Sequence, residues 1–186
     1  MAAGKSEAMK ALEELGAATL STDAVVHELL QTDELHDLLV ERLGPDVAPG
    51  GSVDRSRVAE LAFGDPEQRE WLEGELWPRV GRRVADWKAA VDAADPPPRA
   101  AVVEVPLLFE SGMESVFDHT LAVVADEEVR KRRAGERGHA AVESRSGRQL
   151  SQDEKADRAD FVVRNDGTLD QLKDALGRFL ATISGE

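Results

Sequence analysis

The sequence contains no cysteine, which excludes disulfide bonds, a thiolate nucleophile and cysteine-based zinc sites. Long hydrophobic runs are also missing. No stretch approaches the roughly 20 apolar residues that a membrane-spanning helix needs, and the N-terminus lacks the long apolar segment of a secretory signal. We therefore expect a cytoplasmic protein that has no membrane partner.

Positive charge is scarce. The 186 residues include 37 Asp and Glu against 23 Lys and Arg, which gives a formal net charge of -14. A field of this sign repels polyanions, so nucleic acid is not an expected partner. An anionic substrate would need a local concentration of positive charge, and the densest run is Arg130–Arg133, with Arg137 one helical turn further on.

Hydrophobic periodicity and strong breakers divide the chain into alternating helices and strands. We expect strands at 17–20, 100–105, 120–125 and 160–163. We expect helices at 5–15, 35–43 and 169–183, a further helix that begins at residue 22, and a long helical tract that begins at residue 66 and extends to about residue 87. Gly16 stands where a left-handed helix end belongs. Asp65 and Pro66 are typical of a helix start, and Pro78 should kink or break that helix. This order predicts one α/β domain over 1–186, with three layers and a mainly parallel sheet.

Half of a phosphate-binding motif stands at the N-terminus. Ala3-Gly4-Lys5-Ser6 opens directly into a helix and matches the end of G-x-x-x-x-G-K-[ST]. In that motif backbone N–H groups hold phosphates, the lysine reaches the β- and γ-phosphates, and the hydroxyl binds Mg²⁺. The full motif also needs an earlier glycine and a preceding strand. These four residues alone leave open an ordinary helix that follows a flexible terminus.

Several separated segments, read in order, resemble those of dephospho-CoA kinases, which are P-loop kinases. The most distinctive is Val105-Pro106-Leu107-Leu108-Phe109-Glu110. Ser21-Thr22-Asp23 looks like the family's Asp-x-Asp with the first acid replaced, and Trp77-Pro78 stands where the family usually has His-Pro. The remaining matches are Leu15-Gly16-Ala17, Gly51-Ser52-Val53-Asp54-Arg55, Ala62-Phe63, Leu72-Glu73, Arg133 and Arg137, Arg145 and Gln149, Ala159-Asp160, and Asn165 with Gly167.

The resemblance implies transfer of the γ-phosphate of ATP to the ribose 3′-hydroxyl of dephospho-CoA, the last step of coenzyme A synthesis, with Mg²⁺. It implies catalytic roles for Asp23, Lys5, Arg133 and Arg137. It places ATP against Ala2, Ala3, Gly4, Lys5, Ser6, Glu7, Arg145 and Asn165, with Asn165 near the adenine and the metal at Ser6. It places dephospho-CoA against Asp23, Arg55 and Glu110.

Elementary chemistry fits some of these roles. Asp23 follows an expected strand, at the sheet edge where ligands of open α/β sheets bind, and could accept or orient the hydroxyl proton. It could equally be a helix N-cap. Arg133 and Arg137 lie one helical turn apart, so their guanidinium groups could converge on a triphosphate. Arg145 and Asn165 could also be ordinary surface residues.

The resemblance also implies an architecture: a P-loop kinase-like parallel sheet, a helical substrate-binding insertion at about 33–94 and a helical lid at about 127–158. In the family the first strand is central, and it has no counterpart in this chain. We expect the protein to begin about ten residues before Met1, where the first half of the motif would lie. Two other interpretations stay open: a catalytically inactive homologue that binds CoA or nucleotides, and another small-molecule P-loop kinase. The sequence does not predict an oligomeric state.

Overall fold

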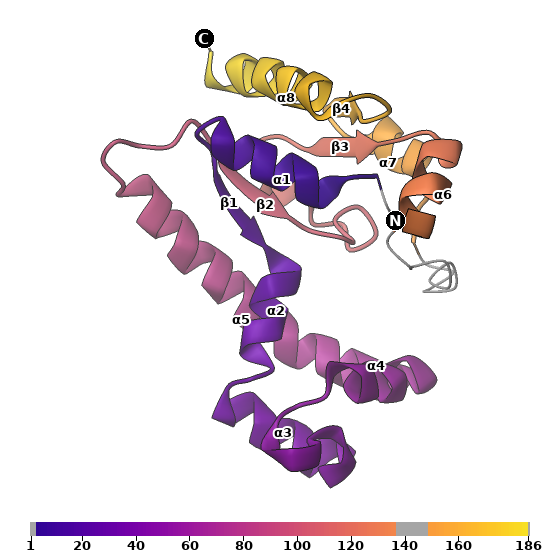
Figure 1. Ribbon diagram of the computed structural model, residues 1–186. Coiled ribbons are helices and arrows are strands. Elements are labelled where there is room, and N and C mark those ends of the chain that lie inside the picture. The colour runs from indigo at the N-terminus through magenta and orange to yellow at the C-terminus, as the bar shows by residue number, and fades with distance from the viewer. Residues whose placement is uncertain (1–2, 137–148, 186) are drawn as a thin grey trace. The chain divides into compact units, whose positions relative to one another are not determined.

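The computed structural model describes residues 3–136 and 149–185. The chain divides into two compact units, which are described separately (Figure 1). Unit 1 comprises Met1–Thr19 and Pro98–Glu186, and unit 2 comprises Leu20–Pro97. Unit 1 is a mixture of helices and strands, whereas unit 2 is almost entirely helical. The α/β class expected from the alternating pattern is therefore confirmed.

The first helix of unit 1 is α1 (Lys5–Glu14). It begins directly after Gly4, whose φ of 92° lies in the left-handed region that only glycine adopts without strain. At the other end Gly16 also has a positive φ, 90°, and its N–H donates to the Glu13 carbonyl. The predicted left-handed end of this helix is confirmed, since Gly16 turns the chain toward the first strand.

The strands are β1 (Ala18–Ser21), β2 (Ala101–Glu104), β3 (Leu121–Val124) and β4 (Phe161–Arg164). Within the described residues they form two separate two-stranded sheets, β1 with β2 and β3 with β4. The β3–β4 pair is parallel, with Leu121 opposite Phe161. β1 crosses the boundary between the units, and its Ala18 N–H donates to the Ala100 carbonyl within unit 1.

The core of unit 1 lies between the strands and two helices, α1 and α8 (Leu169–Ser184), which pack on each other. In Figure 1 α8 runs beside β4. Leu121 and Val123 of β3 pack on this core, while Ala122 and Val124 on the opposite face of the strand are also buried. Burial on both faces is typical of a strand covered by two layers of helices. The buried members of the core are Ala8, Ala11, Leu12, Ala17, Val163, Leu172, Leu176, Phe179 and Leu180.

Two shorter helices of unit 1 follow β3: α6 (Glu127–Glu136) and α7 (Gln152–Arg158). α7 packs against β3. Its start is held by Gln152, whose side-chain amide both accepts from the N–H of Ala125 and donates to the carbonyl of Ala125. One side chain therefore satisfies both polar backbone groups of the residue that follows β3. A single 3₁₀ turn, Glu114–Val116, lies earlier, between β2 and β3.

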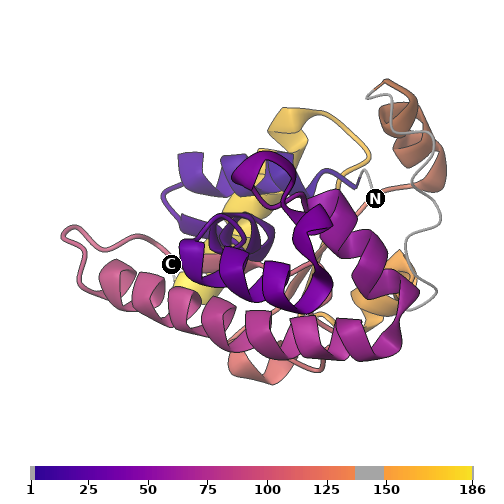
Figure 2. The same cartoon turned by 90° about the horizontal axis from the view of Figure 1, so that it is seen from below.

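Unit 2 contains α2 (Thr22–Leu29), α3 (Asp33–Leu43), α4 (Arg55–Gly64) and α5 (Pro66–Asp92), with 3₁₀ turns at Pro45–Val47 and Pro49–Gly51. α5 packs along α2 and α4, and Figure 2 shows it as the long pink helix running past the purple helices of the same unit. Their shared core consists of Val25, Leu29, Leu30, Leu35, Leu39, Val47, Val53, Val58 and Val80. Unit 2 thus has a hydrophobic core of its own.

The long helix α5 starts as predicted, with Asp65 accepting from the N–H of Glu67 and Pro66 in the first turn. Pro78 was predicted to kink or break this helix, and the break is wrong, because α5 continues through Pro78 to Asp92. Pro78 removes the hydrogen bond to the Gly74 carbonyl, but both residues are exposed, so water can replace the lost donor. Among the described residues, no helix combines the length and apolar character needed to span a bilayer.

Candidate functional site

The Gly4-Lys5-Ser6 segment forms the N-terminus of α1 in unit 1. Lys5 and Ser6 are the first two helical residues, and both side chains are exposed. The backbone N–H groups of a first turn have no helical acceptor, and the helix dipole adds partial positive charge there. Together with the Lys5 ammonium, this makes the start of α1 a suitable binding place for an anion such as phosphate.

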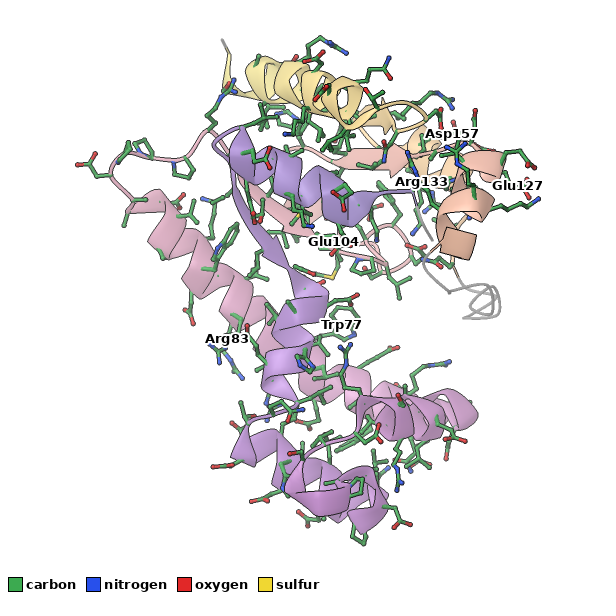
Figure 3. The ribbon with its side chains drawn as sticks, in the orientation of Figure 1. Trp77, Arg83, Glu104, Glu127, Arg133 and Asp157 are labelled. Atoms are coloured by element: carbon green, nitrogen blue, oxygen red, sulfur yellow. The ribbon has the colours of Figure 1, made fainter. Side chains whose placement is uncertain are left out.

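Lys5 is paired with a carboxylate that no motif in the sequence singles out. Its Nζ lies 3.0 Å from Oε1 of Glu104, the last residue of β2, and the lysine side chain is 48% exposed. Figure 3 labels Glu104 on β2. The signal that could have found Glu104 is its position, since an acid at the end of an apolar strand lies at the ligand-binding edge of an α/β sheet.

Asn165, directly after β4, links the start of α1 to α6. Its side chain is buried, and its Nδ2 donates to the carbonyl of Ala3 at 2.9 Å. Its own backbone carbonyl accepts from Nη1 of Arg133 at 2.8 Å. Arg133, labelled on α6 in Figure 3, is therefore held close to the phosphate-binding segment. The structure brings together four predicted site residues: Ala3, Gly4, Arg133 and Asn165.

The loops around Asn165 are tied to each other as well. The N–H of Asp126, just before α6, donates to Oδ1 of Asp166 at 2.6 Å. The N–H of Asn165 donates to the carbonyl of Val124 at the end of β3. A hollow of about 720 Å³ adjoins this loop on the side of α8 and is lined by residues 165–168 among others. The ends of β3 and β4 are therefore fixed relative to the first turn of α6.

Glu110 lies in unit 1, in the segment between β2 and β3, and its hydrogen bonds are made to residues other than those around Asn165 and the start of α1. Its side chain is 10% exposed, and its Oε1 accepts from Lys155 Nζ at 2.9 Å and from the N–H of Leu150 at 2.9 Å. Lys155 also donates to the carbonyl of Pro106. Burial raises the pKa of Glu110, but Lys155 and the backbone N–H groups outweigh burial, so the net pKa lies below its ordinary value of 4.5. Glu110 therefore joins the segment after β2 to the start of α7.

We expect Glu110→Gln to lower the free energy of unfolding by about 1–3 kcal/mol at pH 7, because Lys155 loses its charged partner. A lowered folded-state pKa means that the carboxylate stabilises the fold above its ordinary pKa of 4.5, and that this contribution is lost as the pH falls through the folded-state pKa. The difference between parent and variant should therefore shrink below pH 4.5. Urea unfolding at pH 7 and in this acidic range measures it.

The exposed Asp153 of α7 offers a matched control. Asp153→Asn removes one acidic charge from the same helix that carries Lys155, and it should change the unfolding free energy by no more than about 0.5 kcal/mol. A Glu110→Gln variant as stable at pH 7 as Asp153→Asn would contradict the role assigned to the Glu110–Lys155 pair.

The expected acceptor residues Asp23 and Arg55 belong to unit 2. Asp23 is an exposed residue in the first turn of α2, whose N-cap is Ser21, so the N-cap alternative for Asp23 is wrong. Arg55 is exposed at the start of α4, where the Asp54 side chain accepts from the N–H groups of Ser56 and Arg57. The neighbouring segment 51–53 borders a hollow of about 430 Å³ that α3 also lines.

The remaining predicted site residues are of two kinds. Glu7 lies in the first turn of α1 and forms an exposed ion pair with Lys10. Ala2, Arg137 and Arg145 lie outside the described residues. The assignments of ATP, metal and acceptor contacts to individual residues stay predictions.

Comparison with known proteins agrees with this arrangement. The family model described as "Dephospho-CoA kinase" matches residues 1–171. The "Dephospho-CoA kinase" of Deinococcus radiodurans is 37% identical over 177 residues, covering 94% of this chain and 84% of the relative. That of Symbiobacterium thermophilum is 36% identical over 178 residues, covering 93% and 74%.

Solved structures share the fold. A crystal structure of a Thermus thermophilus protein superposes with a TM-score of 0.82 at 33% identity, covering 98% of this chain and 93% of the other. The dephospho-CoA kinase from Campylobacter jejuni superposes with a TM-score of 0.70 at 24% identity, covering 100% and 94%, which bears on the fold alone. The family model and the curated relatives together establish that this chain belongs to the dephospho-CoA kinase family, whose members are ATP-dependent kinases.

Proposed function

We propose that this chain transfers the γ-phosphate of ATP to the ribose 3′-hydroxyl of dephospho-CoA. The observation that carries the proposal is the placement of Lys5 and Ser6 in the first turn of α1, directly after a left-handed Gly4. This is the arrangement that a phosphate-binding segment of the G-K-[ST] type requires. The proposed acceptor, dephospho-CoA, is inferred from membership of the dephospho-CoA kinase family.

Positive charge on the ATP side comes from Lys5 and Arg133. Phosphoryl transfer depends mainly on positioning and on neutralising the charge of the transferred group, and both side chains lie near the start of α1. The oxygen atoms of the Ser6 hydroxyl and the Glu104 carboxylate are of the kind that Mg²⁺ prefers, and we assign the metal to Ser6 with Glu104 as a candidate second ligand. A bound Mg²⁺ would neutralise part of the phosphate charge.

On the acceptor side we assign Asp23 to the 3′-hydroxyl. A bond forms between the 3′-oxygen and the γ-phosphorus, the bond from that phosphorus to the ADP oxygen breaks, and Asp23 orients or accepts the hydroxyl proton. Arg55 provides a cation for the phosphates of dephospho-CoA. We also assign the helices at about 33–94 to acceptor binding and the segment at about 127–158 to a lid over ATP.

One assay tests the function: ADP release with ATP, Mg²⁺ and dephospho-CoA, for this chain and for a version extended upstream, with phosphate located on the product by mass spectrometry. We expect turnover that depends on dephospho-CoA, and faster turnover in the extended version. Binding without turnover in both would support an inactive nucleotide-binding homologue. Turnover with a different acceptor alone would support another small-molecule kinase.

A further inference from the structure

Asn165 is the one asparagine in the sequence, and it is a buried polar residue directly after β4. Asn165 is 5% exposed, and its side chain reaches the residue before Gly4. Nδ2 donates to the Ala3 carbonyl at 2.9 Å. A buried amide that makes a hydrogen bond of this length fixes both partners, because leaving either unpaired carries a desolvation cost.

Gly4 and Asn165 also fit each other sterically. A Cβ atom at Gly4 would lie 2.1 Å from Nδ2 of Asn165, which is far inside contact distance. Glycine is needed at this position both for its φ of 92° and for the room that the Asn165 amide takes. The amide therefore lies directly against the turn whose N–H groups precede Lys5.

The backbone of Asn165 holds the second positive group of the site. Its carbonyl accepts from Arg133 Nη1 at 2.8 Å, and the same Nη1 would lie 3.9 Å from a Cβ at Gly4. The Asn165 N–H is bonded to Val124 at the end of β3. One residue thus sets the position of the Gly4 turn through its side chain and of Arg133 through its backbone.

We propose that Asn165 is a positioning residue for phosphoryl transfer, which holds the Gly4 turn and Arg133 in one fixed arrangement around the phosphates. This inference rests on the proposed function. It differs from the sequence-based expectation, in which Asn165 lies near the adenine. The two roles make different predictions. A residue that positions the phosphate-binding groups affects the affinity for nucleotides with a β- and γ-phosphate, whereas an adenine contact affects the affinity for every adenine nucleotide alike.

The test is Asn165→Asp, measured by the affinities for ATP and for AMP and by steady-state kinetics. The carboxylate has almost the same shape but cannot donate to Ala3. We expect the affinity for ATP to fall about tenfold, because one hydrogen bond and the alignment of the Gly4 turn are lost. The affinity for AMP should change by less than about twofold. We expect kcat to fall about 100-fold, as for other small displacements of catalytic groups, with KM for dephospho-CoA unchanged.

Asp174→Asn, the reverse exchange at an exposed position of α8, is the matched control and should keep the parental affinities and kcat. Equal thermal unfolding midpoints for both variants exclude a general folding defect. If Asn165→Asp does unfold, Asn165→Ser provides a smaller donor that should recover part of the ATP affinity.

A second measurement compares the double variant of Asn165 and Arg133 with the two single variants. Arg133→Met and Asn165→Asp should together reduce kcat by less than the product of their separate effects, because Asn165 joins the Gly4 turn and Arg133 in one hydrogen-bonded network, so each substitution disturbs the arrangement in which the other group acts. Equal weakening of ATP and AMP, or an unchanged ATP affinity, would overturn the inference while leaving the kinase assignment intact. A parent chain that neither binds ATP nor releases ADP would instead refute the proposed function, and this inference with it.

Discussion

Lys5→Met is expected to reduce kcat/KM for ATP by about 100- to 1000-fold, the usual cost of removing one preorganised group that stabilises the transferred charge. The methylene stem stays, so packing at the start of α1 changes little. The variant also releases Glu104 from its 3.0 Å ion pair with Lys5, which leaves a carboxylate next to the phosphates. Coupled ADP-release kinetics over a range of ATP concentrations measure the effect.

Lys10→Met is the matched control because Lys10 lies in the same helix and its side chain is 70% exposed. It removes the same charge, and its pair with Glu7 is an exposed i,i+3 contact of little energetic weight. We expect parental turnover from this variant. Equal activity of Lys5→Met and Lys10→Met would refute the assignment of Lys5 to the phosphates.

Asp23→Asn should lower kcat by about 100- to 10,000-fold, because the amide keeps the shape of the side chain but cannot accept the acceptor's proton. KM for ATP should stay within about twofold, since the substitution touches the acceptor side alone. Loss of an acid from the first turn of α2 costs at most about 1 kcal/mol of helix stability, so the fold is retained. Steady-state kinetics with each substrate varied in turn separate the two effects.

The exposed Asp86 of α5 is the control for Asp23, since Asp86→Asn makes the same chemical change within unit 2. It should leave kcat unaltered. An Asp23→Asn variant with normal kcat and a raised KM for dephospho-CoA would show that Asp23 binds the acceptor without taking part in proton transfer.

Local signals in the sequence predicted much of the fold. The start of α1 after Gly4, its end at Gly16, and the start of α5 at Asp65 and Pro66 all depend on the conformational preferences of single residues. The family and the kinase class followed from separated segments such as 105–110, and the comparisons confirm both. α4 was not predicted as a separate helix within the helical insertion expected at about 33–94. Its described side chains bury little, chiefly Val58 and Ala62, and its apolar pattern is correspondingly weak.

The arrangement within the site was harder to predict, because it depends on contacts between distant segments. The hydrogen bond between Asn165 and Ala3 joins residues 162 positions apart, and neither residue type signals the other. Glu104 lies within the strand expected at 100–105, and its ion pair with Lys5 depends on how β2 and α1 are placed in the fold. Glu110 belonged to a recognised segment, but its pairing with Lys155 follows from how α7 packs.

Pro78 gives α5 a point of low bending stiffness. A helix resists bending because each turn is closed by hydrogen bonds, and at this position one of them, to the Gly74 carbonyl, is already missing. The adjacent Glu75 carbonyl accepts from Nη1 of Arg79, which supports the backbone next to the gap. Pro78 is therefore the position at which the 27-residue helix α5 can bend with the least loss of helical hydrogen bonds.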